Sequence, residues 1–156
     1  MPIDSTVKHS LKFNVGFLKQ LLAGIEEDQM THQPCPGMNH PAWIVGHLVV
    51  TMGGAAKIAG AGYVPPEGWP ALFGKQSTPV GEAGAYPAKQ ALLDELDKSI
   101  EALMPVVDQL DADALAAENP IEGFRDRMPT VGDALTFIFN SHLGLHCGQL
   151  SAWRRA

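Results

Sequence analysis

Apolar residues recur every three or four positions in four long stretches of the chain, the spacing that places them on one face of an α-helix. These stretches cover about residues 4–28, 40–59, 87–110 and 130–156. No stretch shows the sustained alternation of apolar and polar residues that marks a half-buried strand. The pattern therefore predicts four helices and no strand.

Local signals mark where two of these helices begin. Asn39 or His40 precedes Pro41, and proline is tolerated in the first turn, where its missing N–H has no partner to lose. Thr130 and Asp133 resemble a capping box, with aspartate in place of the usual glutamate. We expect the second helix to begin at about residue 40 and the fourth at Thr130.

The third helical pattern contains Pro105. Proline removes an N–H donor and clashes with the preceding turn, so we expect a kink, or the end of the regular helix near Leu103. The charged residues 111–127 that follow predict an exposed loop or short helical turn.

Residues 60–85 form a long connection between the second and third helices, rich in glycine and proline. Long connections in compact domains are uncommon, and many are functional or disordered. Large apolar residues are spread along it, which favours a segment packed onto the body of the protein: Tyr63, Val64, Trp69, Leu72, Phe73 and Tyr86. One interpretation is a lid over a site, and the other is a tethered crossover with no part in binding.

Four helices of about 20 residues and one long crossover between the second and third predict an all-α fold, specifically a four-helix bundle. The 156 residues are enough for one domain with a sizeable core, so we expect residues 1–156 to form a single domain. Hydrophobic residues make up 46% of the chain and charged residues 18%, as in an ordinary globular protein.

The charge, the hydrophobic segments and the cysteines indicate which partners and which compartment to expect. The formal net charge is −6 and no basic block is present, so we expect no nucleic-acid partner. No segment approaches about 18 uninterrupted apolar residues, so we expect no membrane partner. Cys35 and Cys147 lack metal-like spacing and are typical of reduced thiols, with a disulfide between them as the alternative. The first residues lack a signal-peptide core. We therefore expect a cytoplasmic protein.

Three histidines occupy apolar helical surfaces. His142 and His146 are four residues apart, so both lie on the core-facing side of the fourth helix and offer ring nitrogens to one region. His47 lies in the middle of the apolar second helix and is the natural third ligand of a metal ion. The alternative is three separate core histidines, each satisfied by a hydrogen bond.

Two other features of the fourth helix have alternative interpretations. Gln149 shares the histidine face, and we expect it to support the site or, more simply, to make a core hydrogen bond. The opposite face carries small residues that allow close approach by another helix, within the bundle or in a second subunit: Ser141, Gly144, Gly148 and Ala152.

The stretches Trp43–Leu48 and His142–Leu150 resemble the DinB-like (DinB/YfiT) superfamily of metal-binding helical bundles. The loop Pro34–Asn39 and the stretch Leu72–Lys75 also resemble this family, and the order of elements matches over nearly the whole chain. The pattern is a histidine on the second helix and His-x3-His-x-x-Gln-Leu on the last. It is specific in combination, whereas neither half is specific alone.

The resemblance implies that His47, His142 and His146 bind a divalent metal, most often zinc or nickel. Three imidazoles also suit iron or manganese, and three protein ligands leave an open coordination position. Similar proteins include thiol-dependent transferases and isomerases that use low-molecular-weight thiols, so the resemblance implies a small-molecule substrate and possible use of such a thiol.

The sequence supports two functional hypotheses. One is a metal-dependent enzyme, either a thiol-dependent transferase or a hydrolase, although spacing identifies no general base and no catalytic residue beyond the metal ligands. The other is a non-catalytic metal-binding bundle that forms a homodimer, in which the metal is structural or sensory. A homodimer is expected in either case.

Overall fold

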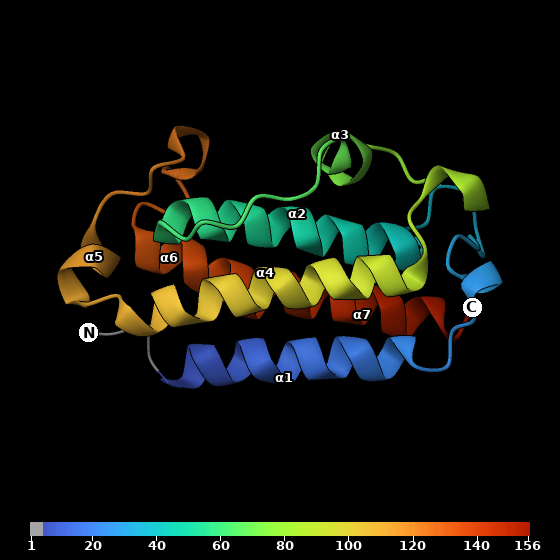
Figure 1. The fold of residues 1–156 in the computed structure, drawn as a ribbon, viewed down its shortest axis with the longest axis horizontal. Coiled ribbons are helices and arrows are strands. Elements are labelled where there is room, and N and C mark those ends of the chain that lie inside the picture. The colour runs from blue at the N-terminus through green and yellow to red at the C-terminus, as the bar shows by residue number, and fades with distance from the viewer. Residues whose placement is uncertain (1–4) are drawn as a thin grey trace.

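The computed structural model describes residues 5–156, and these form helices joined by loops, with no strand (Figure 1). The long helices are α1 (Ser5–Leu22), α2 (Pro41–Ala59) and α4 (Lys89–Gln109). A further helical run consists of α6 (Val131–Thr136), a π-helical turn (Phe137–His142) and α7 (Leu143–Trp153). Two short helices, α3 (Trp69–Phe73) and α5 (Ala112–Ala116), lie in the connections. The prediction of an all-α fold is confirmed.

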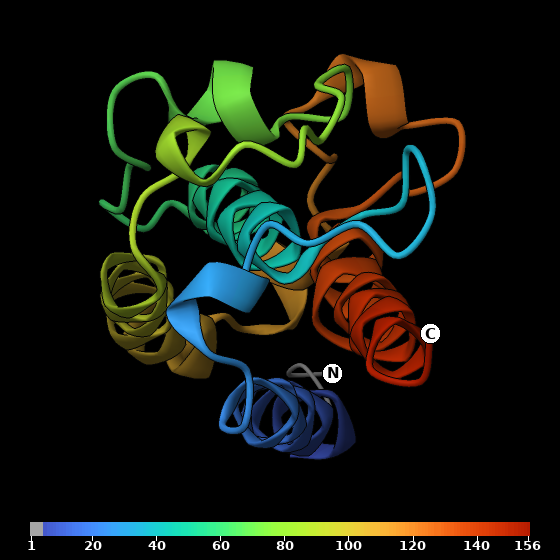
Figure 2. The same ribbon diagram turned by 90° about the vertical axis from the view of Figure 1, so that its right-hand side faces the viewer.

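The long helical runs lie side by side, as the end-on view shows (Figure 2). Helix α2 packs against α4 on one side and against α6 and α7 on the other, and α1 packs against the π-turn and α7. Ion pairs from Lys8 to Asp108 and from Lys19 to Asp97 connect α1 with α4. Helix α1 therefore completes the packing of α4 and α7, which lie on either side of α2.

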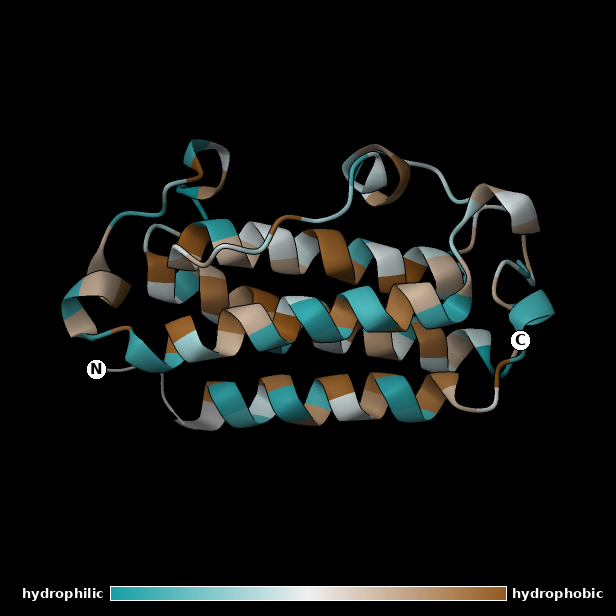
Figure 3. Cartoon of the chain, in the orientation of Figure 1, coloured by the Kyte–Doolittle hydropathy of each residue, from teal (hydrophilic) through white to brown (hydrophobic). Residues whose placement is uncertain are grey.

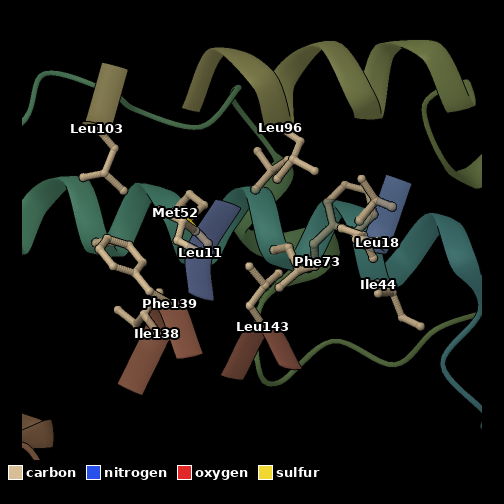
Figure 4. Close-up of a cluster of buried hydrophobic side chains, with 14 of the residues drawn as sticks. Leu11, Leu18, Ile44, Met52, Phe73, Leu96, Leu103, Ile138, Phe139 and Leu143 are labelled. Carbon is tan, nitrogen blue, oxygen red and sulfur yellow. The ribbon is translucent and has the colours of Figure 1, made fainter. Parts of the chain in front are cut away.

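Each long helix directs most of its apolar residues inward, where side chains from all four runs meet (Figures 3 and 4). Leu11, Leu96, Met52 and Phe139 come from four different runs and are fully buried. Helix α2 is apolar on nearly every side because it is the most enclosed. It is the one described helix long and apolar enough to cross a bilayer, yet 78% of its apolar window is buried inside the protein.

Both predicted helix caps are present. The Trp43 backbone N–H donates to Nδ1 of His40, 3.2 Å away, and α2 begins at Pro41. Thr130 Oγ1 accepts a hydrogen bond from the Asp133 backbone N–H, and the Asp133 carboxylate accepts one from the Thr130 N–H, both at 3.1 Å. These bonds satisfy donors that a helix N-terminus leaves without partners.

The ends of two helices differ from the prediction. Helix α1 ends at Leu22 rather than near residue 28, and Nζ of Lys89 donates to the carbonyl oxygens of Leu22 and Ile25 there. Helix α4 begins at Lys89 rather than at Pro87.

Of the two outcomes expected at Pro105, a kink or the end of the regular helix near Leu103, the second does not occur, because α4 continues through Pro105 to Gln109. Pro105 is exposed, and so is Glu101, whose carbonyl loses its helical donor to the proline. Water can therefore form a hydrogen bond with the Glu101 carbonyl, and the helix tolerates a proline at position 105.

A π-helical turn over Phe137–His142 interrupts the continuous α-helix predicted for this part of the chain. Such turns insert one extra residue and leave backbone groups outside the regular ladder. Asn14 of α1 supplies donors at this point, with its Nδ2 lying 3.3 Å from the Phe139 carbonyl oxygen and 3.4 Å from that of Asn140. His142 is the last residue of the turn.

The crossover between α2 and α4 packs onto the body of the protein, as predicted. Within it lies the short helix α3, which crosses α2 (Figure 1), and the α3 residues Trp69 and Phe73 are buried. A Cβ at Gly46 of α2 would lie only 2.3 Å from the Phe73 ring. Glycine at this position therefore allows the crossover to approach α2 closely.

Candidate metal centre

The structure brings together the three histidines that the sequence indicates. His47 comes from α2, His142 from the end of the π-turn and His146 from α7, and one ring nitrogen of each lies within 4.8 Å of the others. The Nε2 atoms of His47 and His142 are 3.1 Å apart. Zinc–nitrogen bonds of about 2.0–2.1 Å in a tetrahedral site place ligand nitrogens roughly 3.3 Å apart, so this spacing fits a metal centre.

The tautomer of His47 is fixed by the crossover. Nδ1 of His47 lies 2.7 Å from the carbonyl oxygen of Phe73, and a carbonyl oxygen only accepts hydrogen bonds. The proton must therefore be on Nδ1, which leaves the lone pair on Nε2, the atom that faces His142. Partners of this kind are what hold ligating imidazoles in known metal sites.

Gln149 fixes the tautomer of His146, again with the proton on Nδ1. Nδ1 of His146 lies 2.9 Å from Oε1 of Gln149, and Nδ2 of Asn39 donates to the same oxygen at 3.1 Å. An amide oxygen accepts only, so the His146 proton is on Nδ1 and the lone pair is on Nε2. Gln149 thus makes a hydrogen bond directly to one of the three histidines.

His142 is the least constrained of the three rings. Its Nε2 lies 3.1 Å from Nε2 of His47 and 3.5 Å from Oγ1 of Thr51. The Thr51 hydroxyl donates to the His47 carbonyl oxygen of its own helix, so its lone pairs are available to the site. Two imidazole lone pairs 3.1 Å apart repel, so the His47 and His142 nitrogens require a shared proton or a cation between them.

Burial keeps all three rings neutral at pH 7. His47 is 9% exposed and His146 is 4% exposed. Desolvation, together with the neighbouring rings, lowers the pKa of His142 and of His146 to about 4, and desolvation also lowers the pKa of His47. A neutral imidazole is the form that binds a metal, so the site needs no deprotonation of its histidines near neutral pH.

Trp43 covers one side of the site. Its ring stacks on His47 with centroids 4.7 Å apart and planes within 9° of parallel, and its Nε1 donates to Oγ of Ser77 in the crossover. Water is therefore excluded from this face of His47. On the other side, the partly exposed Phe137 contacts His142 edge-on, so the site opens beside His142.

The hydrogen bond between Gln149 and His146 agrees with the role expected for Gln149 from the sequence, whereas sequence reasoning missed the parts played by Phe73 and Asn39. Phe73 and Asn39 lie in the two stretches, Leu72–Lys75 and Pro34–Asn39, that resemble the DinB-like family, and that resemblance was the available signal. A backbone carbonyl such as that of Phe73 has no residue-type signature, so no pattern of side chains predicts its role.

Two nearby features are separate from the site. A surface cleft of about 430 Å³ is lined by Pro70, Ala71 and residues 74–77 of the crossover, and none of the three histidines lines it. The two cysteines are free thiols, as predicted. Cys147 faces α1, where its Sγ–H donates to the Asn14 carbonyl, and burial raises the pKa of its thiol to about 11, so it is not a ready metal ligand.

Comparison with known proteins identifies the family. A model of the DinB superfamily matches residues 17–150. The chain belongs to the DinB superfamily. Its fold is also similar to that of a conserved protein from Enterococcus faecalis, with a TM-score of 0.73 over 99% of this chain and 96% of the other, at 16% sequence identity. No curated protein matches the chain.

Membership in the DinB superfamily and the three-histidine cluster agree with the prediction of a metal-binding helical protein. The donor set is three neutral nitrogens, of which two are held with their lone pairs inward. Such a set suits a divalent transition metal rather than calcium or magnesium, which prefer oxygen.

Proposed function

We propose that the protein binds one divalent metal ion through Nε2 of His47, His142 and His146, and that the metal makes it an enzyme. In this proposal the long helices form a four-helix bundle, and the long crossover supplies the Phe73 carbonyl that holds His47. One observation carries the proposal: the three nitrogens converge while Phe73 and Gln149 hold two of the rings in the ligand tautomer.

Zinc or nickel is the expected metal, and iron or manganese would also suit three imidazoles. A metal held by three protein ligands keeps open positions, at which it acts as a Lewis acid toward water or a thiol. We expect the substrate side of the site to be beside His142, which is the partly exposed ring. There the Thr51 hydroxyl, with free lone pairs, would accept a hydrogen bond from a bound water or substrate.

The reaction that we propose is the transfer of a low-molecular-weight thiol to an electrophile, or else the hydrolysis of a small-molecule substrate. Burial of the site supports either, because low polarity around a metal strengthens its effect on a bound nucleophile. The free thiols and the absence of a basic block in the sequence support a cytoplasmic protein that acts on small molecules rather than on nucleic acid.

A non-catalytic metal-binding protein is the second candidate. Within residues 5–156, no carboxylate is hydrogen-bonded to any of the three rings, so no general base is evident beside them. In this alternative, metal binding would join α2 to α7 and stabilise a homodimer. Exposed aromatic side chains on α1 support a dimer, since Phe13 is 63% exposed and stacks on Phe17.

Elemental analysis tests the proposal first. Purified tag-free protein is expected to contain about one divalent metal per chain, and the His47→Ala/His142→Ala variant none. No metal in the wild type, even after dialysis against zinc, nickel and manganese, would refute the metal site. Thiol-conjugation assays and a panel of ester, amide and epoxide substrates then separate the candidates: metal-dependent turnover supports the enzyme, and none supports the non-catalytic protein.

A further inference from the structure

A hydrogen-bonded chain connects the loop before α2 to a histidine of the site. Nδ2 of Asn39 donates to Oε1 of Gln149, and the same oxygen accepts from Nδ1 of His146. Asn39 directly precedes His40, which is fully buried, caps α2 and bonds through Nε2 to the Val80 carbonyl oxygen. The backbone on one side of Asn39 is therefore firmly anchored.

We propose that Asn39 is a positioning residue for the metal centre: it holds the Gln149 amide with its oxygen toward His146 and so keeps the Nε2 lone pair of His146 directed at the other two histidines. The inference rests on the proposed metal site and extends it to a loop residue that acts through Gln149.

The orientation of the Gln149 amide decides where the His146 proton lies. An amide group can turn over and exchange its oxygen with its NH2 group. The turned amide would present NH2 to Nδ1 of His146, which would then have to be the acceptor, and the ring proton would move to Nε2. A proton on Nε2 competes with the metal for the same lone pair.

Asn39 selects between these two orientations. In the observed orientation its NH2 group faces the Gln149 oxygen, which is a favourable donor–acceptor pair. With the Gln149 amide turned over, two NH2 groups would face each other. With its own amide in the observed orientation, Asn39 therefore disfavours the Gln149 orientation in which His146 cannot act as a ligand.

Two nearly isosteric substitutions separate this role from simple electrostatics. Asn39→Asp and Gln149→Glu each replace an NH2 group by an oxygen and add a negative charge near the site. If charge alone mattered, both variants would bind a cation more tightly. The proposed role predicts opposite effects. In Asn39→Asp the new carboxylate would attract the NH2 group of Gln149 and turn the amide, whereas a glutamate at position 149 can only accept and keeps the proton on Nδ1.

Nitrogen-15 NMR of histidine-labelled apoprotein at pH 7.5 reads the tautomer without a metal. We expect His146 to be protonated on Nδ1 in the wild type and in Gln149→Glu, and on Nε2 in Asn39→Asp. An unchanged tautomer in Asn39→Asp would overturn the proposal. If that variant does not fold, Asn39→Ala replaces it, and a mixture of the two tautomers is then expected, whereas a wild-type spectrum would overturn the proposal.

Zinc affinity, measured by competition with a chelator, is the second readout. Loss of a partner that orients a ligand weakens metal binding by about 10- to 100-fold, and we expect this for Asn39→Asp. Gln149→Glu keeps the proton of His146 on Nδ1 and adds a negative charge, so we expect it to bind zinc more tightly than the wild type. Tighter zinc binding by Asn39→Asp would overturn the proposal. If the wild type binds no zinc, the proposed function fails, whereas the NMR measurement still decides what Asn39 does.

Discussion

The carbonyl oxygen of Phe73 lies 2.7 Å from Nδ1 of His47, so the crossover segment supplies the partner of a candidate metal ligand on α2. The contact depends on Gly46, because any side chain there would meet the Phe73 ring. Phe73 is fully buried, so its ring is enclosed by other side chains. Packing of the crossover and geometry of the site are therefore coupled.

Gly46→Ala is expected to lower both the stability of the protein and its affinity for zinc. The new methyl group, 2.3 Å from the Phe73 ring, must push α3 outward, and overpacking of this kind costs about 1–3 kcal/mol in unfolding free energy. The displaced Phe73 carbonyl would also release His47, so zinc affinity should fall by about tenfold or more. Urea unfolding and chelator competition measure the two effects.

Gly16→Ala on α1 is the matched control, since a Cβ there meets nothing within 4 Å. It should leave zinc affinity unchanged and, through helix propensity, raise stability by up to about 1 kcal/mol. Equal behaviour of the two variants would show that the approach of Phe73 to α2 does not matter to the site.

The local features of the fold were readable from the sequence because each depends on residues close together in the chain. The caps at His40 and Thr130 need only the next three residues, and the shared face of His142 and His146 follows from helical periodicity. The pairing of these two with His47 needed only the assumption that apolar helical faces meet in the core.

The features that sequence reasoning missed depend on tertiary context. The π-turn adds one residue without changing the apolar pattern, and the Asn14 amide that pairs with its carbonyls comes from the other end of the chain. The effect of Pro105 depends on solvent exposure, which decides whether the carbonyl of Glu101 has a partner. No local pattern contains this information.

Zinc should raise the melting temperature of the wild type. Ligand at about 100 times its Kd stabilises a folded protein by about 2.7 kcal/mol, which for a chain of this size corresponds to roughly 5–10 °C. His142→Ala removes a proposed ligand and should abolish the shift in differential scanning fluorimetry. His9→Ala, which removes an exposed histidine on α1, should keep it. A zinc-dependent shift that survives in His142→Ala would indicate binding elsewhere.

Stability of the metal-free protein should fall as the pH is lowered from about 6.5 to about 4. In this range an unfolded histidine takes up a proton, whereas His142 and His146, with their pKa lowered to about 4 by burial, remain neutral in the folded state. The unfolded state therefore binds more protons, and each ring contributes a slope of at most about 1.4 kcal/mol per pH unit.

Urea unfolding in the presence of EDTA at several pH values measures this slope. His142→Gln has one buried imidazole fewer, so its unfolding free energy should depend less steeply on pH between about 6.5 and about 4. Parallel curves for the two proteins would mean that His142 titrates alike in the folded and unfolded states.

Asn14 should stabilise the π-turn that ends at His142. Its Nδ2 donates to the part-buried Phe139 carbonyl oxygen and to the exposed Asn140 carbonyl oxygen, and loss of hydrogen bonds of this kind costs about 0.5–1.5 kcal/mol. Asn14→Ala should lower the unfolding free energy by about that amount and speed hydrogen exchange of the amides in the turn. Asn14→Asp should cost more, because a carboxylate only accepts hydrogen bonds and would face two carbonyl oxygens. If both variants match the wild type in exchange of the turn, the π-turn is set by α6 and α7 alone.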